Sequence, residues 1–136
     1  MAKRRDSQKS GLAGEFFVAA ELLKRELQVS LTLGNAKAID LFAHSEATGK
    51  SYQVQVKTLR SSNCYLLRVQ DVSPNYVYVF VVLHKPGQPV EFFLLTGQEI
   101  IENEGALYGG GNGRHTMSGI LMRPLRPYKD RWHLCQ

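Results

Sequence analysis

The stretch SYQVQVKT, residues 51–58, alternates strictly between polar and apolar side chains. A period of two predicts a β-strand, because successive side chains of a strand point to opposite faces of the sheet. One predicted face carries Tyr52, Val54 and Val56, and the other carries Gln53, Gln55 and Lys57. Three polar side chains in a row are ordinarily a face in contact with water, so this strand alone indicates no function.

The stretch before it contains a carboxylate in an unusual place. Residues 38–44, AIDLFAH, also alternate and predict a strand, with Asp40 in its middle. Aspartate is disfavoured inside strands. A turn at residues 48–50 makes the two strands antiparallel neighbours, which brings Asp40 towards Lys57. Two interpretations stay open: a cross-strand ion pair worth ~0.2–1 kcal/mol, or a carboxylate kept there for chemistry.

The segment from Gly11 to about Glu26 predicts an amphipathic helix. Its apolar side chains recur at helical spacing and form one stripe, which we expect to pack on the sheet: Leu12, Phe16, Ala20, Leu23 and Leu27. Glu15 lies at the border of this stripe, near the helix N-terminus, where the helix dipole favours a carboxylate. Glu15 either leans towards the polar patch of the sheet or merely stabilises the first turn.

The remaining pattern predicts an α/β fold. Residues 28–33 alternate like a strand, residues 76–83 are apolar on both faces like a covered central strand, and residues 90–95 return as its hairpin partner. Residues 98–104 suit a short helix, and residues 129–135 suit a short helix or strand in which Trp132 docks the C-terminal segment on the core. The loop Gly109–Gly113 is interpreted as a turn rather than a phosphate cradle, because no strand enters it and no Lys-Ser/Thr pair follows.

Charge and length set outer limits. The chain has 136 residues, the size of one domain, and a net charge of +5. The excess sits at the ends, because residues 1–10 hold four basic residues and one acidic residue, and residues 114–136 hold five and one. Basic ends suit a polyanion such as nucleic acid, but they also serve solubility alone. The charge alone does not distinguish a nucleic-acid partner from a role in solubility.

Location and membrane contact are limited by the apolar runs and the cysteines. The longest apolar run, Val77 to Leu83, has seven residues, far fewer than the roughly 20 that a membrane span needs. No apolar stretch follows the basic N-terminus, so a signal peptide is not expected. Cys64 and Cys135 have neither CxxC spacing nor histidines at zinc-finger spacing. We therefore expect a cytoplasmic protein without a membrane partner.

Together the polar residues have a chemical meaning. The carboxylates of Asp40 and Glu15 and the amide oxygen of Gln55, converging near Lys57, form an all-oxygen site suited to Mg²⁺. A metal ion there would lower the pKa of a bound water, and the lysine would orient the nucleophile or stabilise charge that develops on the phosphate. This is the equipment for hydrolysing a phosphodiester bond.

Three segments carry a resemblance to a known superfamily. They are Gly11-x-x-Gly14-Glu15-x-x-Val18-Ala19-x-Glu21-Leu22, Ile39-Asp40-Leu41 and Gln53-Val54-Gln55-Val56-Lys57-Thr58. The chain resembles the PD-(D/E)xK nucleases, in particular small bacterial members of the Holliday-junction-resolvase-like branch. The resemblance is firm over residues 11–58 and loose over residues 76–96. It implies a restriction-endonuclease-like core, with the N-terminal helix on a mixed sheet of about five strands.

The resemblance also implies roles for single residues. Glu15 matches the helical glutamate, Asp40 the motif aspartate, Gln55 the (D/E) position and Lys57 the lysine, which implies that these four are catalytic. It implies Mg²⁺, or Mn²⁺ as a substitute, held by Asp40, Glu15, Gln55 and the carbonyl of Val56. Two departures are the glutamine at position 55, which removes one negative charge, and Ile39 in place of proline.

The implied function is a metal-dependent endonuclease that hydrolyses DNA, including branched or recombination substrates. One site per chain means that cutting both strands would imply a homodimer. We expect a flexible basic tail over residues 1–9 and a single nuclease-like domain over residues 10–136. The expected contacts to DNA are Arg60, Lys3, Arg4, Arg5, Lys9 and Arg114. The alternative is a catalytically inactive nuclease fold that binds nucleic acid or assembles with other proteins, in which Gln55 marks lost chemistry.

Overall fold

The computed structural model describes the backbone of residues 2–32, 40–61, 64–109 and 119–136, and the side chains in these ranges from Gln8 onward. The first elements are α1 (Ala2–Lys24), β1 (Gln28–Leu31), β2 (Leu41–His44), β3 (Ser51–Leu59), β4 (Tyr65–Leu66) and the 3-10 turn η1 (Val69–Asp71). Then follow β5 (Val77–Val82), β6 (Glu91–Thr96), α2 (Gly97–Glu102), the π-helical turn η2 (Gly105–Gly109), β7 (Gly119–Ile120), and the 3-10 segments η4 (Arg123–Tyr128) and η5 (Trp132–Cys135).

The main sheet has five strands in the order β1-β2-β3-β5-β6. β1, β2 and β3 form an antiparallel meander, β3 pairs in parallel with β5, and β5 and β6 form an antiparallel hairpin. The predicted α/β fold, a helix followed by a mixed five-stranded sheet, is therefore confirmed. β4 and β7 form a separate small pair that the alternation did not predict, because two residues are too few to show a period.

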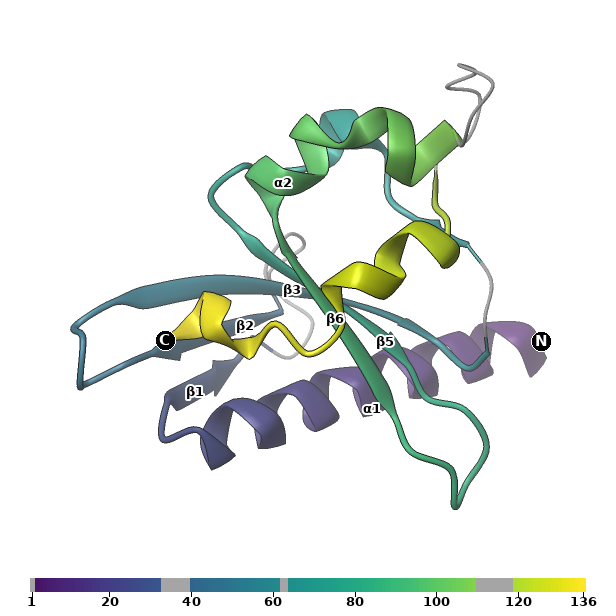
Figure 1. Cartoon of the computed structure of the whole chain (residues 1–136). Helices are drawn as coiled ribbons and strands as arrows, with labels where there is room; N and C mark the ends of the chain where they lie inside the picture. The colour runs from purple at the N-terminus through teal and green to yellow at the C-terminus, as the bar shows by residue number, and fades with distance from the viewer. Residues whose placement is uncertain (1, 33–39, 62–63, 110–118) are drawn as a thin grey trace.

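Two layers cover the sheet (Figure 1). Helix α1 crosses one face and packs on residues such as Leu41, Val54 and Val56. The opposite face of β5 and β6 packs against α2, η2 and η4 through a second apolar cluster that includes Tyr78, Phe80 and Ile100. All six residues of β5 are buried, as predicted for a strand covered on both sides.

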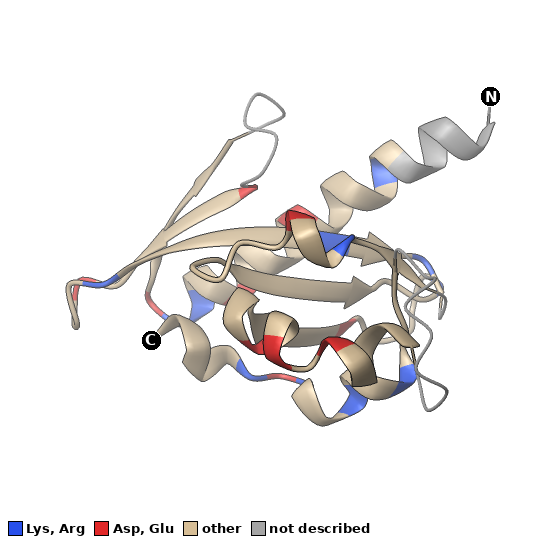
Figure 2. Cartoon of the chain, turned by 90° about the horizontal axis from the view of Figure 1, so that it is seen from above, with Lys and Arg blue, Asp and Glu red and all other residues tan. Residues whose placement is uncertain are grey.

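Charged residues of both signs are distributed over the chain. Acidic and basic residues are interspersed on the helices and turns that surround the sheet (Figure 2). Within the described ranges, no helix is both long and apolar enough to cross a bilayer.

Helix α1 differs from its prediction at its start. It begins at Ala2, not near Ser10, so the expected flexible tail over residues 1–9 is helical from its second residue. Residues 2–9 contain neither glycine nor proline, and Ala, Lys, Arg and Gln are good helix formers. Nothing in this segment therefore prevents the helix from extending back from Ser10 to Ala2.

The predicted apolar stripe of α1 is wrong. Phe16 and Leu23 are 51% and 54% exposed, whereas Val18 and Leu22 are fully buried against the sheet. The face that packs on the sheet also includes Gly14, and small residues of this kind let a helix backbone approach a strand closely. A search for large apolar residues at helical spacing overlooks such a face.

The C-terminal segment behaves as predicted. Trp132 lies in η5, is buried, and packs edge-on against Phe92 with ring centroids 5.2 Å apart. The guanidinium of Arg25, just after α1, lies over the indole at 4.7 Å. Trp132 therefore fastens the end of the chain to both the sheet and the helix. Of the predicted turn Gly109–Gly113, only Gly109 lies within the described residues.

Candidate functional site

Asp40 lies at the point where β2 begins. Its carbonyl accepts the N–H of Thr32, in register with the β1–β2 ladder. Its own N–H donates to the carbonyl of Val54, although the β2–β3 ladder pairs Val54 with Leu41. Asp40 and Leu41 of one strand thus both lie opposite Val54 of the other, which is the arrangement of a β-bulge. Bulges redirect the side chains beside them.

The redirected carboxylate of Asp40 contacts the next strand. Its Oδ2 accepts the N–H of Val56 at 2.7 Å. Asp40 had been expected in the middle of a strand, on the face of Phe42; it instead precedes the strand, and its side chain bonds the backbone of β3. This backbone belongs to the segment in which Gln55, Val56 and Lys57 follow one another.

Helix α1 brings Glu15 to the same place. Gly14 packs so closely on β3 that a Cβ atom at this position would lie 1.8 Å from Oγ1 of Thr58. The next residue, Glu15, is partly buried, and its pKa responds to the negative charge of Asp40. Glu15 was expected near the polar patch because of a stripe that does not pack on the sheet. Its electrostatic interaction with Asp40 instead follows from the close approach of α1 to Thr58 at Gly14.

Gln55 and Lys57 lie on β3 with partly buried side chains, on the opposite face from the buried Val54 and Val56. The predicted alternation of the strand is thereby confirmed. Burial raises the pKa of Asp40, and the positive charge of Lys57 opposes part of this rise, so the two groups lie within electrostatic range of each other. The structure therefore links three of the predicted site residues, Glu15, Asp40 and Lys57, with the Val56 backbone. Gln55 precedes Val56 on β3, and its part in the cluster stays a prediction.

The electrostatics of this cluster are those of crowded carboxylates. Burial and the charge of Asp40 raise the pKa of Glu15 from an ordinary 4.5 to about 7. Burial also raises the pKa of Asp40, although the Val56 N–H and the charge of Lys57 oppose this shift. Two partly buried carboxylates that both resist ionisation are typical of a functional site and favour the binding of a cation.

The donor set can be compared with the needs of Mg²⁺. Within the described ranges, no three His, Cys, Asp or Glu residues form a group suited to a metal ion. The cluster instead offers the two carboxylates of Asp40 and Glu15, and the predicted additional donors are the amide of Gln55 and the carbonyl of Val56. These are all oxygen donors, and Mg²⁺ is held in proteins by one or two carboxylates together with water and substrate phosphate. The donor chemistry fits Mg²⁺, with one carboxylate fewer than a three-acid site.

The predicted DNA contacts are only partly described. Arg60 follows the end of β3 and is exposed, and its carbonyl accepts the N–H of His84. Lys9 is exposed on α1. The side chains of Lys3, Arg4 and Arg5, and the whole of Arg114, lie outside the described residues. Whether any of these residues contacts DNA stays a prediction.

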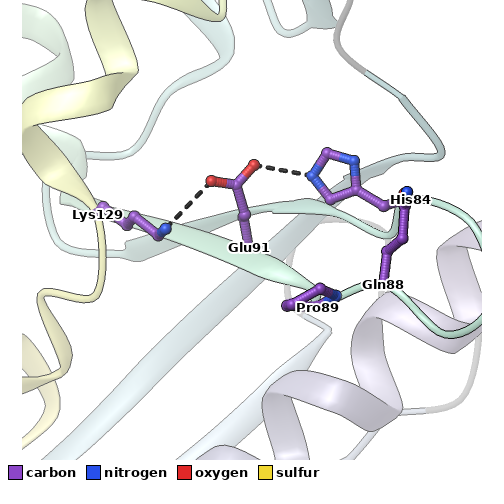
Figure 3. A pocket seen from close by; sticks show the side chains of 5 residues that line it. All are labelled: His84, Gln88, Pro89, Glu91 and Lys129. Atoms are coloured by element: carbon purple, nitrogen blue, oxygen red, sulfur yellow. Dashed lines mark hydrogen bonds and ion pairs between the residues drawn. The ribbon is translucent and has the colours of Figure 1, made fainter.

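A second charged cluster was not found from the sequence. Glu91 at the start of β6 binds His84 at 2.8 Å, Arg126 at 2.8 Å and Lys129 at 3.2 Å. Figure 3 shows His84 and Lys129 on the two oxygens of Glu91, beside a cavity of about 340 Å³ that Gln88 and Pro89 also line. Burial opposes ionisation, yet the hydrogen bonds from His84, Lys129 and Arg126 lower the pKa of Glu91 to about 2.

This cluster has a structural explanation. The contacts of Glu91 with His84, Arg126 and Lys129 connect η4 and the residue after it to the β5–β6 hairpin. No sequence signal could have revealed it, because Glu91 and Arg126 lie 35 residues apart without a shared motif.

The comparisons with known proteins bear on the fold. A bacterial homing endonuclease, I-Ssp6803I, shares it. The two structures agree with a TM-score of 0.58 over 94% of this chain and 91% of that chain, at 18% sequence identity. No protein-family model and no curated protein matches the sequence. At this identity the likeness establishes the fold alone, and the activity has to be argued from the site.

Glu15 should make stability depend on pH. Its carboxyl keeps a proton up to about pH 7 in the folded chain but loses it near pH 4.5 when unfolded, so folding binds protons between these values. The contribution of Glu15 to stability is therefore highest below pH 4.5 and falls as the pH rises to 7. With a chelator present, Glu15→Gln should flatten this fall and raise stability at neutral pH in urea unfolding.

The matched control is Glu21→Gln on the same helix. Glu21 pairs with Arg25 at 2.7 Å, so its removal should not stabilise the protein at pH 7. An unchanged pH slope in Glu15→Gln would show that Glu15 ionises normally in the folded protein.

Proposed function

We propose that the protein is a metal-dependent endonuclease of the PD-(D/E)xK type that hydrolyses DNA phosphodiester bonds. The observation that carries this proposal is the carboxylate of Asp40 on the Val56 N–H, with Glu15 and Lys57 within electrostatic reach. The shared fold with a homing endonuclease supports it. Site and fold are both needed here, because neither alone specifies a reaction.

The residues of the site have distinct roles in this proposal. Asp40, Glu15, Gln55 and the Val56 carbonyl would hold Mg²⁺, with Mn²⁺ as a substitute. When bound, such an ion lowers the pKa of a water and screens the phosphate charge. The ammonium of Lys57 holds the attacking water or stabilises the negative charge that develops on the phosphate. The hydrogen bond from Val56 fixes the orientation of Asp40 before any ligand arrives.

The substrate follows from charge and symmetry. Arg60, Lys9 and the basic residues near both ends of the chain would contact the DNA backbone. Because one chain contributes one site, cleavage of both strands would need a homodimer.

Incubation with linear duplex, supercoiled plasmid and four-way-junction DNA tests the function directly: we expect products with Mg²⁺ and none with a chelator. Binding of DNA without cleavage under every metal condition would contradict the nuclease proposal.

Gln55 supports a second candidate, a nuclease fold that binds nucleic acid or assembles with other proteins without catalysis. A glutamine at this position contributes an oxygen but no negative charge. The metal site then has only two carboxylates, and its affinity for a divalent ion should be lower. The two candidates differ in whether the cluster binds metal at all.

Metal binding should appear as thermal stabilisation. A ligand at ~100 times its Kd stabilises the folded state by ~2.7 kcal/mol. We expect millimolar-range Mn²⁺ to raise the melting temperature of the wild type and to lose this effect in Asp40→Asn. Gln55→Glu should enlarge the shift by adding a third carboxylate.

Gln53→Glu is the matched control for that gain. Gln53 lies on the same face of β3, two residues away and more exposed, so an added charge there should leave the metal-induced shift unchanged. Equal melting curves with and without Mn²⁺ in the wild type and in Gln55→Glu would favour the inactive module.

A further inference from the structure

The side of α1 that faces away from the sheet is apolar. Leu12, Phe16 and Leu23 are 45%, 51% and 54% exposed, and Ala20 between them is exposed as well. We call these four residues the outer stripe. At 100° per residue they fall within an arc of about 80°, nearly opposite the buried Val18. Large apolar side chains gathered on one exposed face mark an interaction surface.

We propose that the outer stripe binds the outer stripe of a second copy, with the two α1 helices antiparallel. The resulting homodimer would have two-fold symmetry, in which the same surface of each copy contacts the other. This inference rests on the shape and charge of α1 and holds whether or not the protein cleaves DNA.

The sizes of the side chains suit such a pairing. Around a two-fold axis that crosses the outer stripe midway between residues 16 and 20, Phe16 of one copy lies opposite Ala20 of the other, so a large side chain meets a small one. Leu12 lies opposite Leu23 in the same arrangement. A parallel pairing would instead place each phenylalanine beside its own copy and leave each alanine beside a gap.

The charges at the two ends of the outer stripe favour the same pairing. Lys9 lies on α1 three residues before Leu12, and Glu26 lies in the turn after α1, three residues after Leu23; both are exposed. The described residues provide neither with an ion-pair partner, whereas Glu21 is already bound to Arg25 and Lys24. In an antiparallel dimer Lys9 of each copy meets Glu26 of the other. This charge complementarity selects a second copy as the occupant.

Sedimentation velocity of the full chain over a range of concentrations tests the proposal. We expect the wild type to form dimers, and Phe16→Asp to weaken self-association by roughly tenfold or more. Because Phe16 is half exposed, its replacement should leave the fold intact, as circular dichroism would verify. Leu66→Asp is the control, since Leu66 on β4 is 79% exposed and lies outside the stripe.

Charge reversal tests the orientation of the helices. Lys9→Glu should weaken the dimer by placing two acidic residues together, and Lys9→Glu with Glu26→Lys should restore it. A wild type that remains monomeric, or a dimer that Phe16→Asp leaves unchanged, would overturn the proposal. A monomer that co-sediments with phosphatidylcholine–phosphatidylglycerol vesicles through Phe16 would assign the stripe to lipid and would overturn it as well. Sedimentation is measured without DNA, so these results depend neither on cleavage nor on the DNA contact proposed for Lys9.

Discussion

Lys57→Ala and Asp40→Asn are each expected to reduce metal-dependent DNA cleavage by at least ~10²-fold. Lys57 is the cation whose charge acts on Asp40, and alanine leaves nothing to hold the water or the developing negative charge. Asparagine in place of Asp40 removes the charge that would hold the metal. Initial rates of plasmid nicking at saturating Mg²⁺ measure both effects.

The choice of asparagine as the replacement for Asp40 separates catalysis from stability. Asp40→Ala would leave the Val56 N–H without its acceptor, which costs about 1–3 kcal/mol when such a group is buried. The amide oxygen of the introduced asparagine keeps an acceptor in the same place, so the melting temperature should change little while cleavage is lost. Full activity in both Lys57→Ala and Asp40→Asn would contradict the proposed site.

Lys50→Ala is the matched control for the lysine. Lys50 is exposed in the turn between β2 and β3, at the other end of the strand that carries Lys57. Its replacement by alanine removes one positive charge, as Lys57→Ala does, but leaves Asp40, Glu15 and Lys57 unchanged. Cleavage by this variant should stay within about twofold of the wild type, which is the scale of a lost exposed charge.

Gly14→Ala is expected to destabilise the protein by about 1–3 kcal/mol or more, the usual range for an overpacked core. The added Cβ would lie 1.8 Å from Oγ1 and 2.9 Å from Cβ of Thr58. Threonine is short and stiff, so the helix must lift away from β3. Urea unfolding measures the loss, and cleavage should fall with it because Glu15 moves with the helix.

Gly11→Ala on the same helix provides the contrast. No atom lies within 4 Å of a Cβ placed at Gly11, so alanine there should stabilise α1 by about 0.5–1 kcal/mol. The double variant Gly14→Ala/Thr58→Ala should recover part of the loss, because it removes the nearest of the clashing atoms. Equal stability of Gly11→Ala and Gly14→Ala would show that the contact with Thr58 is not tight.

Most of the fold could be predicted from period and propensity. The alternation in β3 and the two-sided hydrophobicity of β5 each correspond to one type of strand, so these elements and the hairpin to β6 follow from the residues alone. The face of α1 could not be found in this way. The side of α1 that packs on the sheet depends on Gly14, because the absence of a side chain there lets the helix approach β3 closely. The large apolar Phe16 on the exposed side contributes more to the hydrophobic periodicity than Gly14 does.

The candidate site could be predicted in composition but not in geometry. The alternation and the resemblance pointed to Glu15, Asp40, Gln55 and Lys57. The contact of Asp40 with Val56 depends on a one-residue offset between β2 and β3, and an offset in register leaves no trace in the hydrophobic pattern. The Glu91 cluster was missed because its members come from distant segments that only the folded chain brings together.

The parallel pairing of β3 with β5 has a consequence for how the chain folds. Val54 pairs with Val77, so these two central strands meet only after the intervening segment has closed into a crossover. The meander β1-β2-β3 and helix α1 involve closer neighbours and lose less chain entropy on forming. We infer that they assemble early, and that docking of β5, whose side chains gain burial only when both layers are present, is the slow step of folding.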